Sequence, residues 1–88
     1  MEKVRISSWR DARSIAEEEA EKRLGGKIKD SWVDNIWLSP YSEGNKWIVR
    51  LKVVLTRGLS SKKGYDIFVK LDPVTGEVEE FRASESSR

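Results

Sequence analysis

The sequence Lys-Trp-Ile-Val-Arg-Leu-Lys-Val-Val-Leu-Thr, residues 46–56, has the clearest periodicity in the chain. Apolar side chains occupy alternate positions, as they do in a β-strand with one buried face. The face expected to be buried consists of Trp47, Val49, Leu51, Val53 and Leu55. The opposite face mixes apolar, polar and basic side chains, namely Ile48, Arg50, Lys52, Val54 and Thr56. Residues 46–56 therefore predict a strand that packs on the core through one face.

The same alternation recurs in residues 65–71, Tyr-Asp-Ile-Phe-Val-Lys-Leu. The core face of this second strand is expected to hold Tyr65, Ile67, Val69 and Leu71. The parity that buries them directs Asp66, Phe68 and Lys70 outward. A polar segment with two glycines, residues 57–64, predicts the loop between the two strands.

Residues 72–76, Asp-Pro-Val-Thr-Gly, predict a tight hairpin after the second strand. Pro73 fixes its own φ, and Gly76 accepts a positive φ at no steric cost. Residues 77–82 are then the return strand, whose inward parity the sequence does not assign. Residues 83–88 are serine-rich and are expected to form a flexible C-terminal tail.

Residues 8–24 precede the strands and predict a helix. Ser8 can cap its first turn, and Gly25-Gly26 ends it because a glycine accepts the left-handed conformation of a C-terminal cap. The apolar stripe at helical spacing consists of Trp9, Ala12, Ile15, Ala16, Ala20 and Leu24. We expect this stripe to pack through Ile15, Ala16, Ala20 and Leu24 onto Val49, Leu51, Val53, Ile67 and Val69.

Residues 32–38 fit either a strand or a helix, although their β-branched and aromatic residues favour a strand. In a regular strand Trp32 and Trp37 have opposite parities, so at least one is expected outside the core. The complete order predicts an α+β fold with one N-terminal helix packed on one face of a three- to four-stranded antiparallel sheet. The domain is expected to span residues 1–82, with the other sheet face left to solvent or to a partner.

Composition narrows the classes of function. The chain has 88 residues, a net charge of +2, no Cys and no His. Without Cys the chain can form no disulfide and has no thiolate chemistry, and without His we expect neither His-based catalysis nor His-ligated zinc. No signal peptide or membrane-spanning run is evident, and the sequence predicts a soluble, cytoplasmic protein. Its Lys, Glu and Arg content fits a thermophilic or archaeal source as well. We expect no cofactor, no metal and no enzymatic activity.

The strands also carry a resemblance to known families. A Trp-led strand at Lys46-Trp47, Arg57, the segment from Tyr65 to Asp72, and Gly76-Glu77-Val78 stand at matching places. This pattern resembles the small PepSY-type domains and the O-type accessory proteins of gas vesicles. Both resemblances imply a helper or regulatory role without catalysis. The loop after Arg57 lacks the proline expected of the vesicle family, as the chain lacks that family's C-terminal arginine and tyrosine motif.

Charge distribution indicates where a partner could bind. Residues 46–70 contain seven basic residues and one acid, whereas the chain from residue 72 onward contains five acids and two arginines. The candidate partner-binding residues are Phe68, Arg50, Lys52, Lys70, Arg57, Lys62 and Lys63. The first hypothesis is a non-enzymatic module that binds a protein partner or itself through the uncovered sheet face or an edge strand. The alternative hypothesis is a nucleic-acid-binding module that uses the same basic, aromatic face.

Overall fold

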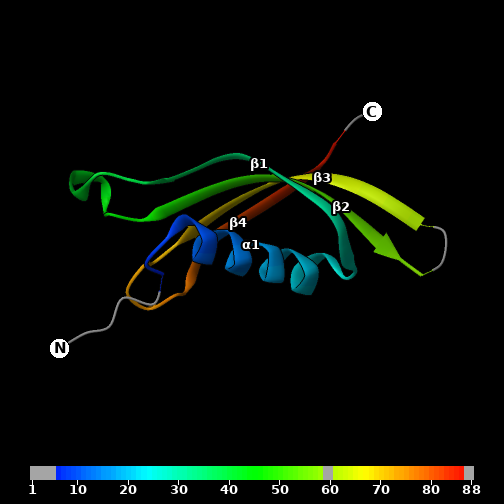
Figure 1. Ribbon diagram of the computed structural model, residues 1–88, viewed down its shortest axis with the longest axis horizontal. Coiled ribbons are helices and arrows are strands. Elements are labelled where there is room, and N and C mark those ends of the chain that lie inside the picture. The colour runs from blue at the N-terminus through cyan, green and yellow to red at the C-terminus, as the bar shows by residue number, and fades with distance from the viewer. Residues whose placement is uncertain (1–5, 59–60, 87–88) are drawn as a thin grey trace.

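The protein is a helix packed on one face of a four-stranded antiparallel sheet, as predicted (Figure 1). The computed structural model describes residues 6–58 and 61–86. Its elements in chain order are α1 (Trp9–Leu24), β1 (Lys27–Leu38), the short 3-10 helix η1 (Tyr41–Glu43), β2 (Trp47–Arg57), β3 (Ser61–Leu71) and β4 (Val78–Glu85). The strands lie in chain order in the sheet, so each pairs with the next one along the chain. None of the described helices is long and apolar enough to cross a membrane.

Local signals at both ends of α1 act as the sequence predicts. The Ser8 hydroxyl accepts a hydrogen bond from the backbone N–H of Asp11 at 3.3 Å, which caps the first turn. Gly25 adopts a φ of 73° at the C-terminal cap, where its N–H donates to the Glu21 carbonyl. Ala12, Ala16 and Ala20 are fully buried, and these small side chains let the helix lie close to the sheet. Trp9 differs from the prediction: it begins the helix beside β1 and stays 47% exposed.

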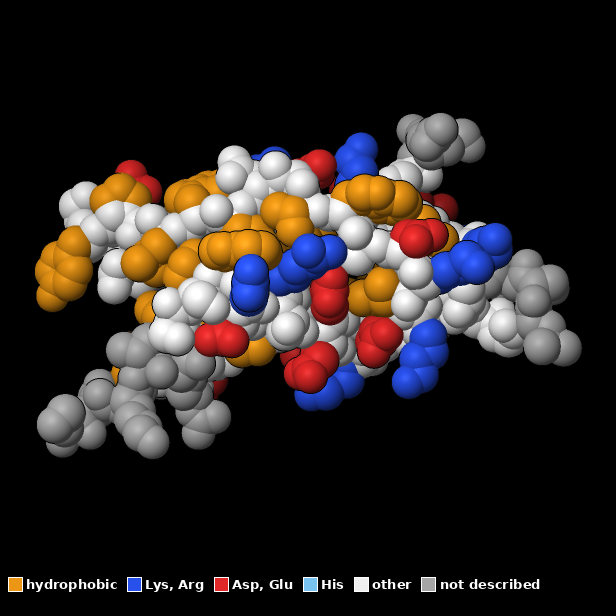
Figure 2. Space-filling view, viewed as in Figure 1, with side chains coloured by type: hydrophobic (Ala, Val, Ile, Leu, Met, Phe, Trp, Pro, Cys, Tyr) orange, Lys and Arg blue, Asp and Glu red, His pale blue; other side chains and the backbone are white. Residues whose placement is uncertain are grey.

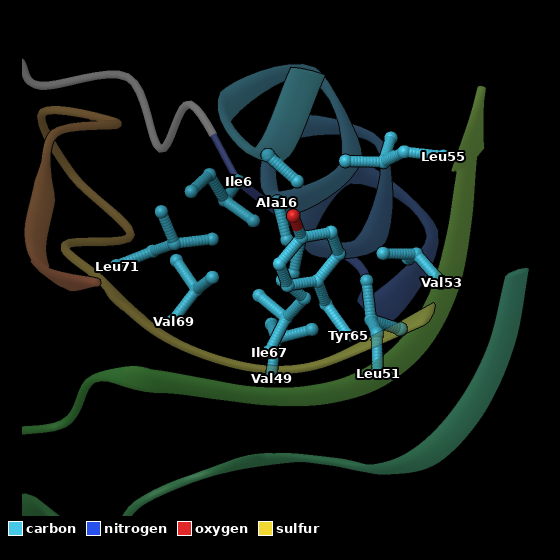
Figure 3. Packing of buried hydrophobic residues seen from close by; sticks show 12 residues of the cluster. Ile6, Ala16, Val49, Leu51, Val53, Leu55, Tyr65, Ile67, Val69 and Leu71 are labelled. Carbon is cyan, nitrogen blue, oxygen red and sulfur yellow. The ribbon is translucent and has the colours of Figure 1, made fainter. Parts of the chain in front are cut away.

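The core lies between α1 and the curved inner face of the sheet (Figure 3). Every inner-face residue predicted for the two central strands belongs to it or packs against it. Leu51, Val49 and Val69 are 0% exposed, while Ile15 and Leu24 of the helix are half-buried at its margin. The predicted docking of α1 onto β2 and β3 is therefore confirmed.

Ile6, ahead of the helix, closes one end of this core. Its side chain is 1% exposed and lies on the same side of the core as Val69 and Leu71 (Figure 3). Its N–H donates to the Pro73 carbonyl at 3.0 Å, and its carbonyl accepts the indole N–H of Trp47 at 3.1 Å. These bonds hold the chain entering α1 against the β3–β4 hairpin and the start of β2.

The ambiguous segment 32–38 is a strand, and β1 begins five residues earlier than predicted, at Lys27. The pairing of β1 with β2 is irregular between Ile28 and Asp30 and again between Val33 and Asn35. Each irregularity shifts the parity of the residues that follow by one position. As a result, Trp32 stands opposite Lys52 and Trp37 opposite Ile48, so both tryptophans lie on the face away from the helix.

Two predicted boundaries need correction. The loop between β2 and β3 is shorter than residues 57–64, because β3 already begins at Ser61. β4 likewise extends past its predicted end, and its Ser84 and Glu85 pair with Asp66 and Tyr65 of β3. Residues 83–85, predicted as part of a flexible tail, therefore belong to the sheet, whereas residues 87–88 of that tail lie outside the described residues.

The hairpin at residues 72–76 forms as predicted, with Gly76 at a φ of 78°. The Asp72 carboxylate accepts the backbone N–H groups of Val74 and Thr75 and the ammonium of Lys46, the last at 2.9 Å. These bonds, with that from Lys46 the strongest, lower the pKa of Asp72 to about 2. The Lys46 ammonium also donates to Glu79, and the two carboxylates together raise the pKa of Lys46.

Candidate interaction surface

The helix covers one face of the sheet, and within the described residues nothing packs over the other face. This outer face is defined by the residues that alternate with the core positions and by their cross-strand partners. Its members are Lys27, Asp30, Trp32, Asn35, Trp37, Ile48, Arg50, Lys52, Val54, Thr56, Lys62, Gly64, Asp66, Phe68, Lys70, Glu80, Arg82 and Ser84. Figure 2 views the molecule from the side of β1 and shows hydrophobic side chains in a broken band above the helix, whose own surface is crowded with charged groups.

Phe68 lies at the centre of the outer face, between two arginines. Register places Arg50 of β2 and Arg82 of β4 on either side of it. The guanidinium carbon lies 5.5 Å from the centre of the ring for Arg50 and 4.6 Å for Arg82, which are cation–π distances. Phe68 is consequently half-buried by its own neighbours, without a second element above it. This aromatic–guanidinium cluster lines a shallow hollow that also includes Lys52, Asp66 and Ser84.

Charges of both signs surround the cluster. Arg82 forms an ion pair with Glu80 at 2.9 Å, and Lys52 lies 4.0 Å from Asp66. Among the described residues Arg50 has no ion-pair partner, so its guanidinium is the available cation next to Phe68. The outer face is therefore electrostatically mixed, with more acidic groups than the basic, aromatic face that the sequence predicts.

A second aromatic group lies on the β1 side of the outer face. Trp32 is 54% exposed and Trp37 is 38% exposed. Ile48 lies between Trp37 and Lys70 in the sheet and is 8% exposed even though no helix covers it. Both tryptophans occupy this face because the irregularity at Asp34 adds one residue between them and so gives Trp37 the same orientation as Trp32. Alternation in the sequence does not reveal this shift.

Only part of the predicted binding set comes together. Phe68, Arg50, Lys52 and Lys70 share the outer face as predicted. Arg57 does not join them, because its guanidinium donates to the carbonyls of Leu24 and Gly25 at the end of α1.

The two loop lysines separate as well. Lys63 stands opposite the core residue Leu55 and forms an ion pair with Glu85 at 2.9 Å, so it has the parity of the helix-covered face. Lys62 stands opposite Thr56 on the outer face, at the far end from the cluster. Arg82 is the important residue that the sequence reasoning missed. Assigning the parity of β4 from Phe81 as an inward residue would have found it.

In the described part of the chain, no three acidic residues gather as a metal site would require. Comparison of the chain with protein families, with curated proteins and with solved structures finds no match. The geometry of the outer face is consequently the basis for a functional proposal.

Proposed function

We propose that this chain is a non-enzymatic protein-interaction module whose outer face binds a partner protein. The observation that supports the proposal most is the Phe68 ring held between Arg50 and Arg82 on a sheet face that α1 leaves uncovered. Aromatic side chains, Phe among them, and arginine are enriched at protein interfaces relative to the rest of the surface. A helper or regulatory role, as the resemblance to PepSY-type domains and gas vesicle accessory proteins implies, belongs to the same proposal.

The chemistry of the cluster indicates the kind of segment that it binds. The fork of Arg50 can hold a carboxylate through two parallel hydrogen bonds. Phe68 stands opposite Arg50 and Trp32 stands opposite Lys52, so each cation has apolar surface beside it. The expected ligand is a peptide segment in which an acidic side chain stands next to an apolar one.

Nucleic acid is the second candidate, because aromatic rings and cations on a sheet also bind single strands. Asp66 and Glu80 argue against it, since these carboxylates lie beside the cations and repel phosphates. A protein partner tolerates and uses such a mixed pattern, with positive groups meeting negative ones and the reverse. We therefore place the protein partner first.

Selection of binding peptides from a displayed random-peptide library tests the proposal directly. Peptides that bind the chain should contain acidic and apolar residues, and Phe68→Ala should weaken their binding by about tenfold to a hundredfold. That range corresponds to the ~1.5–3 kcal/mol gained when a Phe side chain is buried. Val74→Ala is the matched control, because Val74 is an exposed apolar residue in the hairpin, away from the outer face. Circular dichroism should show both variants folded.

Charge substitution then separates the two candidates. Replacing Arg50 and Lys52 together by Gln should slow the association of a protein ligand, with a smaller change in its dissociation rate. A single-stranded oligonucleotide, if it binds at all, should lose affinity and much of its salt dependence in this variant. Salt-sensitive oligonucleotide binding without any selected peptide would replace the protein proposal by the nucleic-acid one. Peptides that bind wild type and Phe68→Ala equally would refute both uses of the outer face.

A further inference from the structure

The free edge of β1 has two halves that differ in how their backbone is covered. β1 and β4 are the edge strands of the sheet. In the first half of β1, helix side chains bond to the outward backbone groups. The Glu21 carboxylate accepts the N–H of Ile28 at 2.8 Å, and the Arg13 guanidinium donates to the carbonyl of Ser31 at 3.2 Å. Such bonds occupy groups that would otherwise pair with another strand.

The second half, residues 32–38, has no such cover within the described structure. Residues on one face of an antiparallel strand share the direction of their backbone groups. Ile28 and Ser31 stand opposite core residues of β2 and direct backbone groups to the free edge. Val33 and Ile36 also stand opposite core residues, so their N–H and C=O groups are expected at the same edge. Among the described residues, no helix side chain bonds to the backbone of residues 32–38.

The side chains of this open half suit association rather than solvent. Val33 is 39% exposed and Leu38 is 45% exposed, next to the two exposed tryptophans, and Asp34 is the only charged residue of the segment. Trp9 of α1 lines a hollow with Val33 and Ile36 on the helix side of the same edge. The other edge strand, β4, has four charged residues among its eight, namely Glu79, Glu80, Arg82 and Glu85. Charged edges resist pairing, whereas long apolar edges promote it.

We propose that residues 32–38 of β1 pair antiparallel with the same segment of a second copy of this chain. The product is a two-fold symmetric dimer in which two four-stranded sheets join into one continuous sheet. This inference goes beyond the proposed function, because it concerns the edge of β1 and a second copy, whereas the proposed function concerns the outer face.

Self-complementarity is the reason for naming a second copy. In a register centred between Asp34 and Asn35, Trp32 stands opposite the second copy's Trp37, and Val33 opposite its Ile36. Outer residues meet outer residues and core-side residues meet core-side residues, so both faces continue across the joint. Asp34 stands opposite Asn35, so this register sets no two like charges directly against each other. Aromatic and β-branched cross-strand pairs of this kind stabilise sheets.

Analytical ultracentrifugation of the full chain across a concentration series tests the dimer. The wild type should sediment with about twice the mass of the 10.1 kDa chain. Val33→Lys places a charge on the open edge and should raise the dimer Kd by at least about tenfold. Val74→Lys is the matched control, since Val74 has the same exposed fraction of 39% and lies in the β3–β4 hairpin. This control should leave the Kd unchanged, and circular dichroism should show that both variants fold.

Hydrogen exchange gives a readout that needs no variant. Amides of Val33 and Ile36 should become more protected as the protein concentration rises, while amides at the β4 edge should not. A monomer at all concentrations up to about 1 mM would overturn the dimer. Equal Kd values for the two lysine variants would also overturn it. A dimer dissociated by Phe68→Ala and not by Val33→Lys would overturn the edge pairing while supporting the outer face. Peptide binding by a purely monomeric chain would reject this inference and leave the proposed function standing.

Discussion

The two faces of the β2–β3 pair share one ladder of backbone hydrogen bonds, but their side chains differ in burial. The ladder runs without interruption from the Trp47–Leu71 pair to the Arg57–Ser61 pair. On one face Val49, Leu51 and Val69 are completely buried, whereas one residue away Arg50 and Lys52 are exposed. The different burial of these residues therefore comes from the side chains and elements that pack against each face, because hydrogen bonding within the sheet treats both faces alike. In this chain α1 buries one face and leaves the other uncovered.

The largest expected effect comes from the buried face. Leu51→Ala should lower the free energy of unfolding by about 2–5 kcal/mol, because it removes a fully buried side chain and leaves a cavity. Lys52→Ala, one position along on the exposed face, should change it by less than about 0.5 kcal/mol. Urea denaturation of both variants measures the contrast between the faces. Equal losses would mean that the faces do not divide stability as proposed.

A smaller loss of stability is expected in the hairpin at residues 72–76, which joins β3 to β4. Gly76→Val should cost about 1–2 kcal/mol, since Gly76 has a φ of 78° and a β-branched residue resists that conformation. Thermal unfolding compares it with Val74→Thr, a substitution at an exposed position of the same hairpin. An unchanged melting temperature for Gly76→Val would refute the requirement for a positive φ at that position.

A substitution of Arg57 distinguishes a role in stability from a role in ligand binding. Arg57→Ala should lower the free energy of unfolding by about 0.5–1.5 kcal/mol, because it removes hydrogen bonds to the carbonyls that end α1. Selected peptides should bind this variant as tightly as the wild type. Lys62→Ala is the control, because the Lys62 side chain is exposed and makes no hydrogen bond or ion pair with the described residues. A loss of binding with unchanged stability would return Arg57 to the binding set.

Acid should weaken the fold in a way that depends on Asp72. Its folded pKa of about 2 lies below the ordinary value of 3.8, so the ionised carboxylate stabilises the folded state. This contribution is complete above the ordinary pKa and is lost as the pH falls toward 2. Asp72→Asn should therefore lower the melting temperature at neutral pH and make it fall less between pH 5 and pH 2. Parallel acid dependence in the two proteins would contradict the role of the Lys46–Asp72 bond.

Patterns within short segments were sufficient for much of the fold. The capped helix with its alanine stripe, the inward faces of β2 and β3 and the hairpin at residues 72–76 all follow from the sequence. Each depends on periodicity or turn chemistry that residues close in the chain determine by themselves. The same parity places Phe68, Arg50, Lys52 and Lys70 together, because residues of adjacent strands with the same parity share a face.

Only the tertiary structure decided the composition of the surfaces. The irregularities of β1 arise from its pairing with β2, so alternation alone cannot place Trp32 and Trp37 on one face. Arg82 reaches Phe68 because the register of β4 on β3 brings together residues from different strands. Arg57 bonds to the helix end and Arg13 to the edge of β1 for a similar reason: each bond joins residues far apart in the chain. Local periodicity fixes which side chains can be buried, whereas register and packing between distant segments fix which of the exposed ones become neighbours.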